Sequence, residues 1–241
     1  MSFRPAPALA PAAADTRPAD RVLVAPDVLI DSRLALFHRT ERWLAVADLH
    51  YGYELSLRAA GALTPLWGMD EIEARLRALL ADYLPARLIL CGDLVHSRAS
   101  REEARALFDR LRGLGADTGD GGGCEIIPLA GNHDCRAFAA GELRTSFQTP
   151  TFFFHHGDQP ADAAAVGDRT EILGHYHPAA TLSDGAGFYV KLPAFIQDTK
   201  ARRWILPAFS PWAAGGVKSG GYGAGARVWR CSPRRIFPPP L

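Results

Sequence analysis

The sequence predicts a layered α/β fold, in which two mixed β-sheets pack together and helices flank them. In the first half of the 241-residue chain, short apolar runs alternate with helical patterns. In the second half, short strand patterns are separated by turns, with little helix between them. Helices between early strands favour parallel pairing, and strands joined by turns favour antiparallel pairing. We therefore expect both kinds of pairing within one domain over residues 21–236.

Three strands are expected in the first half, because three apolar runs have strand length and are followed by turn residues. They are 43–47 (WLAVA), 87–91 (RLILC) and 125–129 (EIIPL). Pro128 argues against the third strand, since proline removes a donor from the hydrogen-bond ladder between strands.

Two helices are expected between these strands. Apolar residues recur at helical spacing over about 70–83, which indicates an amphipathic helix that Pro85 ends. The sequence at 100–103 (SREE) has the form of a capping box, which should start the next helix. Glycine and aspartate fill most of 115–123, which we expect to be a flexible loop.

The second half is expected to contain further strands, and both chain ends are expected to be loose. Four segments have strand patterns: 151–155, 170–173, 187–192 and 203–205. Residues 1–20 are rich in alanine and proline, so we expect a disordered N-terminal extension, and residues 237–241 should form a loose tail.

Composition and charge favour a cytoplasmic protein. The formal net charge is +1, which counts mildly against non-specific DNA binding and leaves room for a local basic groove. The four cysteines form no C-x-x-C pair, which is typical of reduced thiols in the cytosol. No apolar run is long enough to cross a bilayer, and the N-terminus lacks the layout of a signal peptide, so no membrane partner is expected.

Polar side chains gather in five short segments that follow expected strands. The segments are 48–50 (DLH), 92–96 (GDLVH), 131–134 (GNHD), 155–158 (HHGD) and 174–177 (GHYH). Carboxylate, imidazole and amide oxygen together suit divalent metals such as Mn²⁺, Fe²⁺ or Zn²⁺. A carboxylate can bridge two such ions, and two ions about 3.5–4 Å apart can clamp the attacking and leaving oxygens of a phosphoryl displacement. The glycines before Asp93, Asn132 and His175 would allow tight turns that bring these side chains together.

The order and form of these segments resemble the calcineurin-like metallophosphoesterase superfamily, from about Trp43 to Trp212. The resemblance implies that superfamily's sandwich of two mixed sheets flanked by helices. It also implies two divalent metal ions, with Mn²⁺ as the first expectation and Fe²⁺ or Zn²⁺ as alternatives. The reaction would be hydrolysis of a phosphoester bond by metal-activated water.

The resemblance assigns roles to individual side chains. It implies that the first metal is held by Asp48, His50 and His177, the second by Asn132, His156 and His175, and both by a bridging Asp93. His133 would not bind metal but would contact the scissile phosphate and assist the leaving group. Asp134 would hold the imidazole of His133 in the right tautomer and orientation.

Several of these residues have alternative interpretations. Taken alone, Asn132 could be a turn residue and Asp134 a helix cap. His155 should be structural, because its neighbour on the strand points to the opposite face. His96 stands where many relatives carry aspartate, and it could support another side chain or contact the substrate. Asp158 could support a metal ligand or shape a turn.

Further segments look like the ligase-associated DNA damage response endonuclease (PdeM) family. These segments are 48–54 (DLHYGYE), 58–61 (RAAG), 92–97 (GDLVHS), 174–179 (GHYHPA), 192–195 (LPAF) and 206–209 (LPAF). This resemblance implies a Mn²⁺-dependent phosphodiesterase or DNA endonuclease, linked to a DNA ligase and a helicase in bacterial repair. The oligomeric state is open, a homo-oligomer included.

Other functions stay open at this point. The near-neutral charge and the HGD form at 156–158 fit a small-molecule phosphodiesterase or pyrophosphatase acting on nucleotides or lipid precursors. A non-catalytic binding module of a repair complex is the third possibility.

Tyr51 and Tyr53 could stack on a base or pack locally. Seven basic residues could line a groove for phosphates or form a solvated face: Arg33, Arg39, Arg58, Lys191, Lys200, Arg202 and Arg203.

Overall fold

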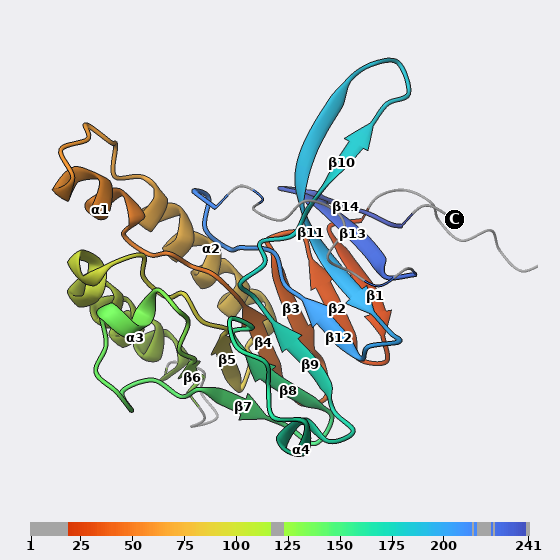
Figure 1. Cartoon of the computed structure of the whole chain (residues 1–241), viewed down its shortest axis with the longest axis horizontal. Helices are drawn as coiled ribbons and strands as arrows, with labels where there is room; N and C mark the ends of the chain where they lie inside the picture. The colour runs from red at the N-terminus through yellow and green to blue at the C-terminus, as the bar shows by residue number, and fades with distance from the viewer. Residues whose placement is uncertain (1–18, 117–122, 214, 216–222, 224, 240–241) are drawn as a thin grey trace, which may run out of the picture.

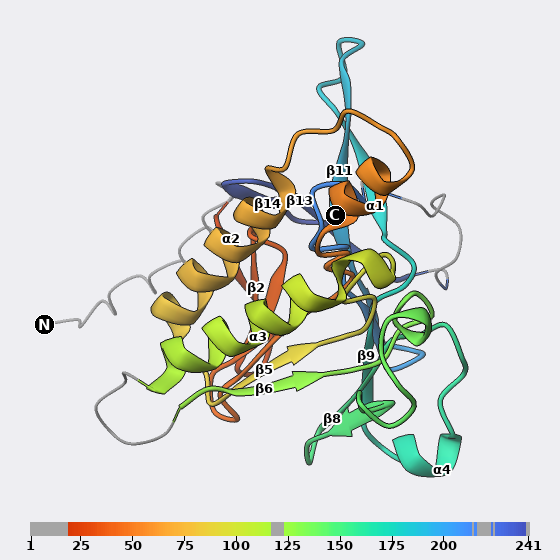
Figure 2. The same ribbon diagram turned by 90° about the vertical axis from the view of Figure 1, so that its left-hand side faces the viewer.

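Two mixed β-sheets pack against each other, and two long helices lie together on the outer face of the first sheet (Figures 1 and 2). These helices are α2 (Gly68–Tyr83) and α3 (Arg101–Ala116). The fold class expected from the sequence is therefore confirmed. The computed structural model describes residues 19–116, 123–213, 215, 223 and 225–239.

The first sheet contains six strands in chain order. They are β1 (Arg21–Ala25), β2 (Val28–Asp31), β3 (Ala35–His38), β4 (Trp43–Val46), β5 (Arg87–Leu90) and β6 (Glu125–Pro128). β4, β5 and β6 are parallel neighbours, as the intervening helices indicated, whereas β1 to β4 pair antiparallel. β6 comes last in this order, which explains how Pro128 fits into a strand, because proline is tolerated at sheet edges.

The second sheet contains eight strands, in the order β14-β13-β11-β12-β9-β8-β7 with β10 paired to β11. They are β7 (Ser146–Gln148), β8 (Phe152–His155), β9 (Thr170–Leu173), β10 (Ala179–Ser183), β11 (Tyr189–Asp198), β12 (Arg203–Ile205), β13 (Arg227–Ser232) and β14 (Arg235–Phe237). The four strands predicted in this half correspond to β8, β9, β11 and β12. β8, β9 and β12 are parallel neighbours, which departs from the antiparallel pairing expected there. β10 and β11 form a hairpin that projects from the body (Figure 1).

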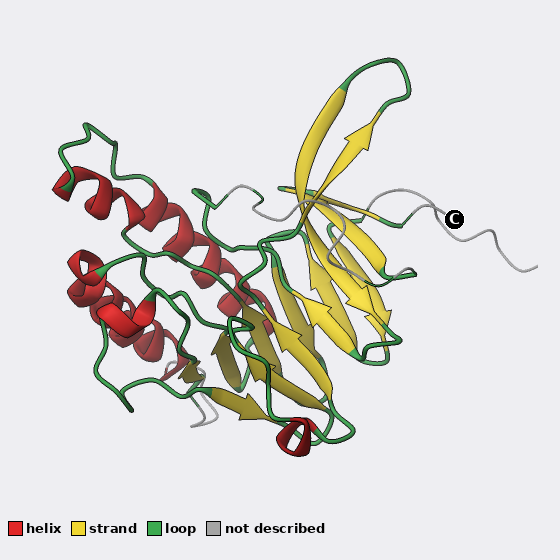
Figure 3. Ribbon diagram, viewed as in Figure 1, coloured by secondary structure: helices red, strands yellow, loops and turns green. Residues whose placement is uncertain are grey.

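The two predicted helices are present, and shorter ones accompany them (Figure 3). α2 ends at Tyr83, two residues before Pro85, and α3 begins directly after Ser100. The Ser100 hydroxyl donates to the carbonyl of Gly52 at 2.7 Å. Ser100 therefore ties α3 to the start of α1 instead of closing the expected capping box. The short helices are α1 (Tyr53–Ala59), α4 (Ala163–Val166) and the 3₁₀ turns Arg98–Ser100 and Asp134–Arg136.

The core between the sheets includes Trp43 of β4, which is fully buried. Its ring meets Phe152 and Phe154 of β8 edge to face, with centroids 5.1 and 5.0 Å apart. All four residues of β4 are buried, because the second sheet covers one face and the helices cover the other. This two-sided burial explains why the sequence of β4 is a continuous apolar run.

Three expectations fall partly outside the described residues. The N-terminal extension (1–20) is described only at its last two positions, and the glycine-rich loop (115–123) only at its ends. The tail (237–241) is described to Pro239, and Phe237 belongs to β14. The single domain over 21–236 stays a prediction. None of the described helices is both long enough and apolar enough to span a membrane.

Asp31, at the end of β2, is a carboxylate that joins the first sheet to α2. It is 1% exposed and accepts hydrogen bonds from the Arg33 guanidinium at 2.6 and 2.9 Å and from the Tyr83 hydroxyl at 2.8 Å. Burial by itself raises the pKa of Asp31, but the hydrogen bonds outweigh burial, and the net pKa is lowered. The ionised form of Asp31 is therefore favoured by folding.

Asp31→Asn should lower the free energy of unfolding by roughly 2 kcal/mol near pH 7, because it removes a carboxylate that accepts charged hydrogen bonds. A lowered folded-state pKa means that this stability is present above the ordinary carboxylate pKa and is lost as the pH falls through the folded-state value. Urea unfolding with EDTA, from about pH 7 to about pH 3, measures the difference between wild type and variant, which should shrink on acidification. Asp109→Asn on α3, whose side chain is 75% exposed, is the control. A difference that does not change with pH would contradict this account.

Candidate metal centre

The ends of five strands carry the five polar segments and meet where the two sheets join. The segments follow β4, β5 and β6 in the first sheet and β8 and β9 in the second. Backbone hydrogen bonds connect these loops: the Asp48 N–H donates to the Gly92 carbonyl at 3.1 Å, and the His50 N–H donates to the Asp93 carbonyl at 2.9 Å. The Ser210 N–H donates to the Asp48 carbonyl at 3.1 Å, which joins the loop after β12 to the loop after β4. The carboxyl ends of the parallel strands therefore form one site, as in other α/β proteins.

Five of the seven expected metal ligands have a left-handed backbone conformation. Their φ angles are 55° at Asp48, 42° at His50, 49° at Asp93, 67° at His175 and 44° at His177. This conformation is uncommon for residues other than glycine and costs free energy, so the surrounding structure must impose it. Such backbone strain gathers at functional sites, and here it turns neighbouring side chains toward one another.

One cluster joins four of the expected ligands. Asp48, His50, Asp93 and His177 each present a ligand atom within 4.8 Å of the others. Asp48 is fully buried and Asp93 is 2% exposed. The Nε2 atom of His177 is buried, has no hydrogen-bond partner among the described residues and lies 3.4 Å from Oδ1 of Asp48. A cation between these two atoms would satisfy both.

A second cluster joins the remaining expected ligands. Oδ1 of Asn132 lies 3.1 Å from Nε2 of His156 and 3.1 Å from Nδ1 of His175, and the two nitrogens are 3.2 Å apart. Nε2 of His156 is also 3.4 Å from Oδ1 of Asp93, which connects the two clusters. Ligand atoms about 2.1 Å from one ion lie roughly 3 Å apart when they are neighbours, so these spacings fit a metal site.

The electrostatics of the site favour a bound cation. Within the described part of the chain, the ion pairs of Asp48 and Asp93 involve imidazoles and no arginine or lysine. Burial lowers the pKa of His50 to about 2, with neighbouring imidazoles adding to the effect, so this ring is neutral and can act as a ligand. Burial also raises the pKa of Asp93. Buried carboxylates beside a neutral imidazole form a donor set that divalent metals stabilise.

Two glycines allow the loops to come this close. A Cβ at position 131 would lie 2.3 Å from both the backbone nitrogen and Oδ1 of Asp93. A Cβ at position 174 would lie 2.6 Å from Oδ2 of Asp48 and 2.6 Å from the side chain of Ala47. Gly131 and Gly174 therefore let the loops of β6 and β9 touch the two buried carboxylates, as their positions in the sequence suggested.

His133 lies at the open side of the site, and its side chain is 36% exposed. Its Nδ1 is 3.3 Å from the His96 carbonyl, and the two rings stack with centroids 4.8 Å apart. Asp134 has different contacts from those expected. It accepts hydrogen bonds from the backbone N–H groups of Leu94, Val95 and Gly131 at 3.2, 3.1 and 2.9 Å. No described hydrogen bond joins Asp134 to the imidazole of His133. Asp134 thus holds the loops of β5 and β6 together, whereas the His96 carbonyl lies against the ring of His133.

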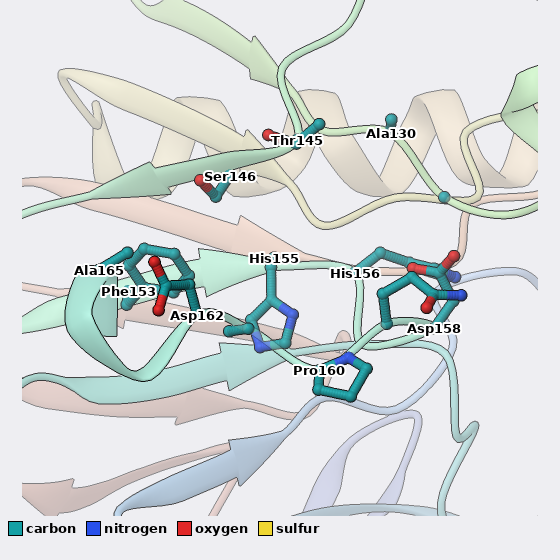
Figure 4. Close-up of a pocket in the computed structure, with 13 residues that line it drawn as sticks. Ala130, Thr145, Ser146, Phe153, His155, His156, Asp158, Pro160, Asp162 and Ala165 are labelled. Carbon is teal, nitrogen blue, oxygen red and sulfur yellow. The ribbon is translucent and has the colours of Figure 1, made fainter. Parts of the chain in front are cut away.

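His155 belongs to neither of the two ligand clusters described above. It lines a cavity of about 390 Å³ that also includes Asp158 (Figure 4). Its Nε2 lies 3.4 Å from Oε1 of Glu171. His38 is buried and accepts a hydrogen bond from the Glu41 N–H at 3.0 Å, so it is a core residue.

Most of the basic residues considered for a DNA groove have local partners. Arg33 pairs with Asp31, Arg202 with Asp168 and Arg203 with Glu171. Lys191 donates to the Gly215 carbonyl at 2.8 Å, and Arg58 donates to the Thr64 carbonyl at 2.7 Å. Tyr51 is buried and packs locally, whereas Tyr53 is partly exposed and lies beside His96 with ring centroids 4.6 Å apart.

Glu54 and Trp212 form a contact beside the site that the sequence analysis did not identify. Glu54 is fully buried, accepts the Trp212 indole N–H at 3.0 Å and accepts the Met69 N–H at 2.9 Å. The available signal was the place of Glu54 at the end of the segment 48–54, which begins with a metal motif, but a contact over 158 positions is not visible in one sequence.

Comparisons with known proteins agree with this architecture. A family model described as calcineurin-like phosphoesterase matches residues 42–224, which is more than half of the chain. The crystal structure of the nuclease MPE of Pseudomonas putida is similar, with a TM-score of 0.63 and 24% sequence identity, and the match covers 88% of this chain and 94% of that chain. No curated protein sequence matches. The structural similarity shows a shared fold.

Gly131→Ala should lower the affinity for divalent metal about tenfold or more, because the new Cβ would displace the Asp93 carboxylate and disturb a contact next to the ligands. Titration of metal-free protein with Mn²⁺, followed by calorimetry, measures the change. Gly113→Ala on α3, where a Cβ would meet nothing within 4 Å, is the matched control. The control should bind Mn²⁺ like wild type and gain about 0.5–1 kcal/mol of stability. Wild-type affinity in Gly131→Ala would show that this close approach is not required.

Proposed function

The chain belongs to the calcineurin-like phosphoesterase family and is therefore a metal-dependent phosphoesterase, and we propose that it is a two-metal phosphodiesterase that cuts DNA. One observation carries the two-metal part: the seven expected ligands form two clusters that share Asp93. The DNA part is supported by the PdeM-like segments and by the similarity to the structure of the nuclease MPE. The exposure of Asn132 and His133 also supports it, since a phosphodiester within a long chain needs an open site.

The residues present fit two divalent ions, and we propose Mn²⁺, with Fe²⁺ and Zn²⁺ as alternatives. Asp48, His50 and His177 would hold one ion, Asn132, His156 and His175 the other, and Asp93 both. When bound, such ions supply Lewis-acid stabilisation of the phosphate charge and an activated water for attack in line.

The chain's own contribution to proton transfer is assigned to His133. If its Nδ1–H donates to the His96 carbonyl, Nε2 is left as the nitrogen that faces the substrate. A protonated His133 could then give the Nε2 proton to the leaving oxygen, which is general acid catalysis. The backbone N–H of His133 donates to Oδ1 of Asp93 at 2.9 Å, which fixes the position of the residue relative to the proposed bridging ligand. Asp134 assists indirectly, through the loops that it connects.

The biological setting is also a proposal. The PdeM-like segments support a cytoplasmic enzyme of bacterial DNA repair that works with a DNA ligase and a helicase. We place the catalytic unit in one domain over residues 21–236. A small-molecule phosphodiesterase or pyrophosphatase is the alternative that the experiments below separate.

Asp93→Asn should lose nearly all cleavage of single-stranded, nicked and gapped DNA with Mn²⁺, because it removes a charge shared by both proposed metal sites. His133→Gln should lower the rate on DNA about 10²- to 10⁴-fold. The same variant should lose less on bis(p-nitrophenyl) phosphate, whose acidic leaving group departs without a proton. Initial rates on both substrates measure this contrast, and Asp109→Asn is the matched control for a lost carboxylate.

The outcomes separate the proposals. If wild type hydrolyses bis(p-nitrophenyl) phosphate or a nucleotide pyrophosphate but leaves every DNA substrate intact, the DNA part fails and the small-molecule alternative gains. Equal losses of His133→Gln on both substrates would contradict its role in leaving-group departure. If neither variant differs from wild type in any phosphoesterase assay, the proposed mechanism fails and the non-catalytic binding module gains.

A further inference from the structure

Four rings lead away from the catalytic side of the metal centre, and we name them the aromatic run: His96, Tyr53, Trp212 and Trp67. His96 stacks on His133, with ring centroids 4.8 Å apart. The next steps are 4.6 Å from His96 to Tyr53, 6.1 Å from Tyr53 to Trp212 and 4.8 Å from Trp212 to Trp67. All of these spacings lie in the range of interacting aromatic pairs. The aromatic run is thus a continuous path from His133 to the loop between α1 and α2.

The indole ring of Trp212, the third ring of the run, is held in a fixed orientation. The indole N–H of Trp212 donates to the fully buried Glu54, which also accepts the backbone N–H of Met69 at the start of α2. A Cβ at position 68 would lie 2.1 Å from Nε1 of Trp212, so only glycine allows the indole to pack here. The ring is therefore preorganised, which lowers the entropic cost of stacking a ligand on the run.

Exposure distinguishes Trp67 from the core tryptophans. Trp43, Trp204 and Trp229 are 0%, 8% and 4% exposed, whereas Trp67 is 43% exposed. Large aromatic side chains stabilise a fold by burial, so half-exposed Trp67 contributes less in this way. Trp67 is thus the exposed end of the path that starts at His133.

We propose that the aromatic run is a stacking platform for the bases of a single-stranded nucleic acid whose phosphodiester lies in the metal centre. This inference rests on the proposed function. Every base has a face that can stack on an aromatic ring, so such a platform accepts any sequence. In a duplex the bases are already stacked and paired, so the platform favours single strands. Arg58, in the last turn of α1, donates to the carbonyl of Thr64. Because this carbonyl is neutral, the contact leaves the positive charge of Arg58 available for a backbone phosphate.

The kinetic test compares a long single-stranded oligonucleotide with bis(p-nitrophenyl) phosphate, a small diester that carries no nucleobases. Trp67→Ala should raise KM for the oligonucleotide about fivefold or more and leave the small diester unchanged. Trp67→Phe keeps a ring and should recover most of the loss. Leu63→Ala is the matched control, because Leu63 is a fully exposed apolar side chain in the same loop.

A second readout needs no catalysis. With EDTA present, the oligonucleotide should quench the tryptophan fluorescence of wild type, and Trp67→Phe should lose much of this quenching, because the other tryptophan of the run, Trp212, has limited exposure. An oligonucleotide of abasic sites with the same number of phosphates should quench weakly. Equal quenching by the abasic and normal oligonucleotides would show that phosphates, and not bases, occupy the site.

Three kinetic results would overturn the proposal. Trp67→Ala could have the same KM for the oligonucleotide as wild type, it could lose as much activity on the small diester as on the oligonucleotide, or Leu63→Ala could raise KM for the oligonucleotide as much as Trp67→Ala does. The proposed function fails separately. If wild type hydrolyses the small diester and cuts no DNA, but base-dependent quenching is present, the run is a nucleic-acid site without cleavage. If quenching is also absent, both proposals are wrong.

Discussion

The structure depends on the burial of two carboxylates, Asp48 and Asp93, where the ends of the two sheets meet. Asp48 connects the sheets directly: its carboxylate accepts the His175 N–H at 3.0 Å, and its carbonyl accepts the Ser210 N–H. Buried carboxylates without cationic side chains nearby are costly unless something positive compensates them. Asp48 therefore holds the sheets together, and the two buried carboxylates create the demand for a cation.

This demand explains the local backbone. Ten described residues other than glycine have positive φ, and five of them are expected ligands. The strain persists because the loops are fixed on several sides, by the three backbone donors to Asp134 and by the glycines that admit Asp93 and Asp48. A donor set prepared in this way binds a metal with little rearrangement, which suits chemistry that needs exact positions of phosphate oxygens.

The sequence predicts those parts of the fold that follow from burial on both faces. The parallel strands β4 and β5 appear as apolar runs because sheet and helices cover them, and the order of polar residues at strand ends predicts the site. The short helix α1 has no side-chain cap, and β1 to β3 lack intervening helices, so local patterns did not separate them. The contacts of Asp134 and the Glu54–Trp212 pair join distant segments, and no local pattern specifies such partners.

The central claim is that one bridging carboxylate organises two metal ions. Anomalous X-ray diffraction from crystals soaked in Mn²⁺ tests it most directly. The account predicts two anomalous peaks about 3.5–4 Å apart, with a carboxylate oxygen of Asp93 contacting both. A single peak, or two peaks without Asp93 between them, would contradict it.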